Sequence, residues 1–300
     1  MTAPAEELSM PVPPLPAAAD LLRVRYGRTT IDGLSVFHRS AGDPAAPAFV
    51  LLHGFPSSSH MFRELIPKLA THFHVIAPDY IGFGHSDAPS AELFEYSFDR
   101  IAGIVATLLE RLGVTRYHLY LQDYGGPIGL RLASAAPERV LGLVFQNANL
   151  YAEGIGEAAA GLFLPLWERG NETGARQMLT IEATRWQYTA GTRNPDGLNP
   201  DAWLHDQAGL DRPGSAERHL ALFRDYRHNV ARYPAWQQYL RTWQPKTLVA
   251  WGRHDPIFIA AGAEAFRRDL ERPAIHYLES GHFALEEDAD AIAALILRTF

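Results

Sequence analysis

The feature that most constrains the fold is an abrupt change of pattern at Asp123. The apolar run at 117–121 predicts a buried strand, and a helical pattern begins near Ile128. Asp123, Tyr124 and two glycines lie between the two patterns. A strand that passes through a glycine-rich turn into a helix is typical of a sheet of mostly parallel strands. The sequence therefore predicts an α/β protein with a carboxylate at the carboxyl-terminal edge of its sheet.

The composition narrows the choice of partners. Hydrophobic residues make up 47% of the 300 residues, charged residues make up 20%, and the net charge is −7. No block of like charges occurs, which argues against nucleic acid or an anionic membrane as the main partner. The chain has no cysteine, so disulfides, a thiol nucleophile and cysteine metal sites are excluded.

The amino-terminal segment gives no targeting signal. It is rich in proline and alanine, lacks a basic start, and no run of about 18 apolar residues occurs in the chain. We expect residues 1–18 to be a flexible arm and the protein to be cytoplasmic.

Strand and helix signals alternate in two parts of the chain, 19–148 and 244–300. Strands are predicted at 21–28, 34–39, 48–53, 74–77, 117–122, 140–146, 247–251 and 274–278, and helices at 59–70, 98–112, 128–136, 260–270 and 288–298. Residues 149–243 carry helical patches and many aromatic side chains but little strand signal. We therefore predict a mostly parallel eight-stranded sheet flanked by helices, with 149–243 inserted as a helical cap.

Three polar residues follow predicted strands. Asp123, Asp255 and His282 each stand just after a strand, where a doubly wound sheet binds its ligands. A fourth turn, beginning with His53 and Gly54, follows the strand at 48–53. We expect these residues to converge at one edge of the sheet.

Five motifs together resemble the α/β-hydrolase superfamily, in the branch that contains epoxide hydrolases and haloalkane dehalogenases. They are His-Gly-Phe-Pro at 53–56, Gly-Phe-Gly-His-Ser at 82–86, Gln-Asp-Tyr-Gly-Gly at 122–126, Trp-Gly-Arg-His-Asp-Pro at 251–256 and Ser-Gly-His-Phe at 280–283. The resemblance extends over nearly the whole chain from about residue 22. It implies the α/β-hydrolase fold and a reaction without cofactor or metal.

The resemblance also implies roles for single residues. Asp123 would be the nucleophile, at the position where many hydrolases of this fold have serine. A free carboxylate titrates near about 4, so Asp123 would be ionised and could form an alkyl ester at a saturated carbon. His282, oriented by Asp255, would then be the general base that activates water. The backbone N–H groups of Phe55 and Tyr124 would form the oxyanion hole.

The leaving group depends on the cap. Epoxide hydrolases protonate the ring oxygen with cap tyrosines, whereas haloalkane dehalogenases bind the halide with N–H donors, commonly a tryptophan after the nucleophile. This chain has Tyr124 and Phe55 at the donor positions, and Tyr226 resembles a cap acid. Trp167 lies near the expected place of the second cap tyrosine, and either Tyr151 or Tyr188 could substitute. Both Tyr226 and Trp167 could instead be ordinary apolar packing residues.

The sequence thus favours an epoxide hydrolase that gives vicinal diols. The alternative is a haloalkane dehalogenase with an atypical halide site, in which Trp167 donates to the halide. An esterase-like hydrolase and a non-catalytic binding protein of the same fold are further alternatives. The expected substrate is a small apolar organic molecule, together with water, in a pocket formed by Trp167, Tyr151, Tyr188 and Phe283. A cap open to solvent could bind a second copy of the chain, so a homodimer is also considered.

Overall fold

The computed structural model describes residues 21–300, and the predicted arm at 1–18 lies outside this range. Within the described range, eight strands form one sheet in the order β1-β2-β4-β3-β5-β6-β7-β8. The strands are β1 (Arg25–Ile31), β2 (Leu34–Ala41), β3 (Ala48–Leu52), β4 (His74–Pro78), β5 (Tyr117–Gln122), β6 (Val140–Gln146), β7 (Thr247–Gly252) and β8 (Ala274–Leu278). Strand β2 pairs antiparallel with β1 and β4, and the other pairs are parallel. The predicted mostly parallel eight-stranded sheet is confirmed.

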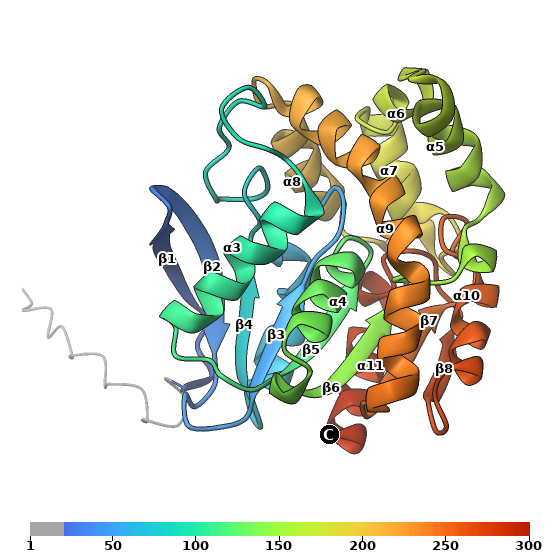
Figure 1. Ribbon diagram of the computed structural model, residues 1–300. Helices are drawn as coiled ribbons and strands as arrows, with labels where there is room; N and C mark the ends of the chain where they lie inside the picture. The colour runs from blue at the N-terminus through green and yellow to red at the C-terminus, as the bar shows by residue number, and fades with distance from the viewer. Residues whose placement is uncertain (1–20) are drawn as a thin grey trace, which may run out of the picture.

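Helices cover both faces of the sheet (Figure 1). The helices α3 (Phe98–Arg111), α4 (Gly125–Ala135) and α10 (Ala260–Ala265) pack on one face, together with part of α9 (Ser215–Trp243). On the other face lie α2 (Leu65–Leu69) and α11 (Leu285–Thr299). Successive residues of the central strands alternate between these two cores, as the pleat of a strand requires. Leu121 and Leu119 face α4, for example, while Tyr120 faces α2.

The regular secondary structure between β6 and β7 consists of helices. It contains α5 (Glu157–Arg169), α6 (Thr173–Gln177), α7 (Ile181–Thr189), α8 (Pro200–Leu210) and α9. Figure 1 shows α5, α6, α7 and α8 gathered at one end of the sheet. Helix α9 extends from this group down along α4, so residues on one continuous helix contact both parts of the molecule. The division into core and cap at residues 148 and 244 stays a prediction. Helix α9 ends at Trp243, the last residue of the predicted cap.

Local boundaries differ from the predictions where prolines and caps intervene. The predicted helix at 59–70 is two pieces, a 3-10 turn at Ser59–Phe62 and helix α2. Pro67 lies in the first turn of α2, where its missing N–H breaks no hydrogen bond, so a new helix can begin there. Strand β1 begins at Arg25, four residues later than predicted. Within residues 21–300, no helix is both long and apolar enough to span a membrane.

Candidate active site

Asp123 occupies a strained turn between β5 and α4. Its φ of 47° lies in the left-handed region, which is uncommon for a residue with a side chain. The turn packs closely against β3. A Cβ built on Gly54 would lie 2.3 Å from Asp123 Cβ, and one on Gly125 would lie 2.0 Å from the Leu52 carbonyl oxygen. Glycine is therefore required at both positions, because any side chain there would overlap the closely packed turn.

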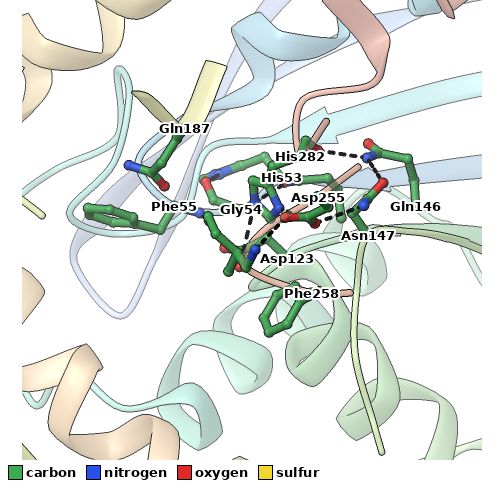
Figure 2. Close-up of polar contacts among 12 residues, drawn as sticks. His53, Gly54, Phe55, Asp123, Gln146, Asn147, Gln187, Asp255, Phe258 and His282 are labelled. Atoms are coloured by element: carbon green, nitrogen blue, oxygen red, sulfur yellow. Dashed lines mark hydrogen bonds and ion pairs between the residues drawn. The ribbon is translucent and has the colours of Figure 1, made fainter. Parts of the chain in front are cut away.

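The two oxygens of Asp123 have different surroundings. Oδ1 accepts a hydrogen bond of 2.7 Å from the Phe55 N–H, and the Tyr124 N–H also donates to the carboxylate. Oδ2 lies 4.0 Å from Nε2 of His282 (Figure 2). The two residues expected to form an oxyanion hole thus both donate to the carboxylate, and Oδ2 faces an imidazole. A carboxylate held in this way can attack with one oxygen while the other is already stabilised.

His282 lies between two carboxylates. Its Nδ1 is 2.8 Å from Asp255 Oδ2, and its ring is 1% exposed. Asp255 accepts further hydrogen bonds from the Ile257 N–H at 2.7 Å and from Asn147 Nδ2 at 2.8 Å. With Nδ1–H donated to Asp255, Nε2 keeps a lone pair on the Asp123 side. The structure therefore brings together Asp123, Asp255 and His282 at the carboxyl ends of β5, β7 and β8.

An amide network that the sequence did not indicate supports this arrangement. Asn147, just after β6, accepts from the Gly252 N–H at 2.8 Å and donates to Asp255, which joins the ends of β6 and β7. Gln146 Nε2 donates to the His282 carbonyl oxygen at 3.0 Å, and Gln122 Nε2 lies 3.2 Å from His282 Nε2. Figure 2 shows Gln146 and Asn147 beside the Asp255–His282 pair. The one feature of the sequence that points to these amides is their position at the end of a buried strand.

Burial and neighbouring charges act in opposite directions on the pKa values of Asp123 and His282. Burial raises the pKa of Asp123, although His282 and the Phe55 and Tyr124 N–H groups favour the ionised form. Burial disfavours protonated His282, but the Asp255 and Asp123 carboxylates outweigh it and raise the pKa of the imidazole. An imidazole with a raised pKa is a stronger base for a proton taken from water.

A narrow cavity of about 50 Å³ opens over Asp123. It is lined by Phe55, Asp123, Tyr124, Ile155, Ala159, Phe163, Trp167, Met178, Gln187, Phe223, Tyr226, Ile257 and Phe258. Most of these side chains are apolar, and they come from the core edge and from α5, α7 and α9. A cavity of this kind accepts a small, uncharged organic group next to the carboxylate.

Tyr226 and Trp167, two of the predicted cap residues, both line this cavity. Their rings stack with centroids 6.0 Å apart and planes within 1°. Trp167 Nε1 donates a hydrogen bond of 2.8 Å to the Phe223 carbonyl oxygen, so its N–H is occupied within the cap. The Tyr226 hydroxyl is buried and makes no hydrogen bond of regular geometry. Trp167 therefore presents ring surface to the cavity, whereas Tyr226 has a donor to offer.

Three other predicted pocket residues do not line the cavity, and the expectation for them is corrected. Tyr151 packs against Phe266 on α10. Tyr188 stacks on Phe283 with centroids 3.9 Å apart, and its hydroxyl donates to Asp206 at 2.5 Å.

For Tyr188, the correction follows from the orientation of α7 about its axis. Successive residues of a helix point about 100° apart, so only one of two neighbours can face the cavity. On α7 that residue is Gln187 and not Tyr188. Sequence reasoning missed Gln187 because a lone glutamine in an aromatic segment gives no signal.

Comparison with known proteins agrees with this geometry. Residues 47–289 match the family model described as the alpha/beta hydrolase fold. An uncharacterized hydrolase of Saccharomyces cerevisiae is 40% identical over 90% of this chain and 94% of its own length. Haloalkane dehalogenase 1 of Mycobacterium bovis is 30% identical over 84% of this chain and 83% of its own length.

Two solved structures share the fold at lower identity. The epoxide hydrolase CorEH superimposes with a TM-score of 0.77 at 21% identity and covers 93% of this chain and 99% of that one. A loop variant of haloalkane dehalogenase DbeA from Bradyrhizobium elkanii gives a TM-score of 0.77 at 24% identity, covering 91% and 95%. The chain belongs to the α/β-hydrolase superfamily and is a hydrolase related to the haloalkane dehalogenases, and it shares its fold with an epoxide hydrolase.

Proposed function

We propose that this hydrolase opens epoxides to vicinal diols through a covalent ester on Asp123. The observation that carries the proposal is the unequal environment of the two Asp123 oxygens. Oδ1 accepts a hydrogen bond from the Phe55 N–H, and Oδ2 lies 4.0 Å from His282 Nε2. The Asp123 side chain lines the cavity. Such a carboxylate is suited to attack at saturated carbon, because it needs no base to activate it.

In the first step, Asp123 Oδ2 forms a bond to a ring carbon while the carbon–oxygen bond of the epoxide breaks. The electron pair of that bond stays on the ring oxygen, which takes a proton from Tyr226. In the second step, His282 removes a proton from water, and the resulting hydroxide attacks the carbonyl carbon of the ester. The Phe55 and Tyr124 N–H groups stabilise the oxyanion until it collapses and releases the diol. The proton taken up by His282 balances the proton lost from Tyr226 over the cycle.

Tyr226 favours an epoxide over a halide as the leaving group. Its hydroxyl is buried, lacks a regular hydrogen-bond partner and belongs to a side chain that lines the cavity. Burial holds the pKa of Tyr226 well above its usual value, so the phenol stays protonated and can donate at neutral pH. An alkoxide needs this proton, whereas a departing halide does not.

The second candidate is a haloalkane dehalogenase. The similarity to haloalkane dehalogenase 1 of Mycobacterium bovis supports it. The occupied N–H of Trp167 weakens the halide site predicted from the sequence, but the Gln187 amide also lines the cavity. Gln187 Nε2 makes only a long contact of 3.4 Å to the Ala183 carbonyl oxygen, so it could turn toward a halide. The arrangement of Asp123, Asp255 and His282 argues against a non-catalytic binding protein. The Phe55 and Tyr124 N–H groups would also suit ester hydrolysis as a side activity.

The covalent step can be tested in heavy-oxygen water. After a single turnover with excess enzyme, one labelled oxygen should appear in the peptide that contains Asp123, because water attacks the ester at the carboxylate carbon. The same peptide from enzyme incubated without substrate is the control. An unlabelled peptide after complete turnover would rule out the aspartyl ester.

The leaving group can be tested with a matched pair of substrates, 1,2-epoxybutane and 1-bromobutane. Both are small and apolar, and they differ mainly in the group that leaves. We expect faster formation of butane-1,2-diol than of bromide, and turnover of only the bromoalkane would favour the dehalogenase. The cytoplasmic location and the homodimer remain predictions from the sequence.

A further inference from the structure

Three buried tyrosines lie near the nucleophile. The Tyr226 and Tyr233 hydroxyls interact with each other in poor hydrogen-bond geometry, and the Tyr124 hydroxyl has no partner within residues 21–300. Tyr124, Tyr226 and Tyr233 are 4%, 8% and 3% exposed. A buried hydroxyl that lacks a partner is destabilising, so proteins rarely keep one without a use. The Tyr124 hydroxyl therefore suggests that a ligand supplies the missing acceptor.

Two of the three phenols line the cavity. Tyr124 follows Asp123 at the start of α4 in the core, and Tyr226 lies on α9. Their ring centroids are 5.9 Å apart, with planes tilted by 36°. The edge of Phe98 packs against both rings, at 4.8 Å from Tyr124 and 5.6 Å from Tyr226. This contact fixes the two rings relative to each other, with Asp123 beside them.

The neighbouring polar groups have other partners. The Asp225 carboxylate, the acidic group on α9 next to Tyr226, accepts from the Phe98 N–H and contacts His228 Nδ1, each at 2.7 Å. Tyr233 lies two turns along α9 from Tyr226, but it is not among the lining residues. Of the two phenols that line the cavity, Tyr226 interacts with the Tyr233 hydroxyl, whereas the Tyr124 hydroxyl has no partner within residues 21–300.

Building on the epoxide reaction proposed above, we propose that Tyr124 is the second donor to the leaving oxygen. When the carbon–oxygen bond breaks, Tyr226 transfers its proton to the ring oxygen, and the Tyr124 hydroxyl donates a hydrogen bond to the same oxygen. Tyr124 then has two functions, because its backbone N–H donates to the Asp123 carboxylate while its side chain donates to the leaving oxygen. One phenol from the core and one from the cap thus take the place of the cap tyrosines that protonate the ring oxygen in epoxide hydrolases.

The test measures ester formation in a His282→Gln background, where hydrolysis is blocked and the mass of the ester can be followed. With 1,2-epoxybutane, Tyr226→Phe should slow alkylation by about 10²- to 10⁴-fold, as for loss of a general acid. Tyr124→Phe should slow it by about 10- to 100-fold, the range for one hydrogen bond to a charged oxygen. With 1-bromobutane, both changes should be several-fold smaller, because bromide leaves without a proton.

Tyr151→Phe is the matched control, since Tyr151 is a buried tyrosine that does not line the cavity. It should leave both alkylation rates unchanged, and thermal unfolding should show that all variants are folded. Equal epoxide alkylation by Tyr124→Phe and its parent would overturn the role of Tyr124 and leave the proposed function intact. Absence of any epoxide ester in the parent would overturn both.

A second variant separates donation from packing. Fluorotyrosine at position 124 keeps the size of the ring but makes the hydroxyl more acidic. A donor at this position should move the alkaline limit of epoxide alkylation to lower pH. An unchanged pH profile in a folded protein would contradict the proposal, because a phenol that only packs has no influence on that limit.

Discussion

The proposed attacking groups on the core wall of the cavity differ from Tyr226 and Gln187 on the cap wall in how well hydrogen bonds satisfy them. On the core side, the Asp255 oxygens accept from Ile257, Asn147 and His282, and Asp123 Oδ1 accepts from Phe55. On the cap side, Tyr226 has no regular partner and Gln187 has only a contact of 3.4 Å. The comparison supports the proposal that the groups for attack are positioned before substrate arrives, whereas the substrate itself completes the hydrogen bonds of the donors to the leaving group.

The difference has a structural cause. The core residues stand at the ends of neighbouring parallel strands, whose register is fixed by backbone hydrogen bonds. The cap residues lie on helices that meet through aromatic rings, such as the stacked pair Trp167 and Tyr226. Apolar contacts are not directional, so they tolerate small shifts that a hydrogen-bonded network does not.

The largest expected effect comes from the core wall. Asp123→Gly should reduce turnover by about 10⁴-fold or more, because it removes the proposed nucleophile. The same change should leave the protein at least as stable, since Gly accepts a φ of 47° and the buried carboxylate is lost. Steady-state turnover and thermal unfolding check both parts. Asp32→Gly, at a φ of 50° in an exposed turn, is the control for the backbone alone. Retained turnover would contradict the proposed role.

A smaller loss is expected from the network behind the triad. Asn147→Gly keeps the left-handed backbone at position 147 but deprives Asp255 of a donor and the Gly252 N–H of its acceptor. We expect a loss of about 2–3 kcal/mol in the free energy of unfolding and a turnover lower by about tenfold or more. Denaturant unfolding and turnover would measure these changes. If unfolding changes while turnover does not, Asn147 acts on folding and not on the orientation of His282.

A contact between the cap and the core should make a contribution to stability that depends on pH. Tyr188, stacked on Phe283 beside His282, donates to Asp206 on α8, and burial raises the pKa of Asp206 to about 7. The folded protein thus binds this proton more tightly than the unfolded chain. The contribution of Asp206 to stability is therefore fully present below pH 4 and is lost as the pH rises toward about 7.

Asp206→Asn should remove this dependence and stabilise the protein above pH 7 by about 1–3 kcal/mol. Thermal unfolding of both proteins from pH 5 to pH 9 tests it, with the difference between them growing as the pH rises. A constant difference over that range would mean that Asp206 titrates normally.

The smallest effect is expected on the cap wall. Trp167→Phe removes the N–H that donates to the Phe223 carbonyl oxygen but keeps an aromatic ring in the cavity. We expect a loss of about 1 kcal/mol in unfolding free energy and little change in the ratio of epoxide to bromide turnover. A selective loss of bromide turnover would instead favour Trp167 as a halide donor and weaken the contrast between the two walls.

Much of the fold and part of the site could be predicted because they depend on local patterns. Apolar runs and helical spacing predicted the eight strands, and each strand end marked the position of Asp123, Asp255 or His282. The amides of Asn147 and Gln146 were missed, because their function depends on contacts with residues far along the chain. The predictions that placed Tyr151 and Tyr188 in the pocket were wrong for the same reason.

The sequence by itself determined the order of the strands and helices and the residue types at the strand ends, because spacing and turn chemistry are written in neighbouring positions. Only the tertiary structure decided which cap side chains face Asp123. A rotation of one residue along α7 exchanges Gln187 for Tyr188, and no local pattern records that rotation. It also decided that the Trp167 N–H is occupied while the hydroxyls of Tyr124 and Tyr226 have no regular partner, since hydrogen bonding depends on atoms that meet only after folding.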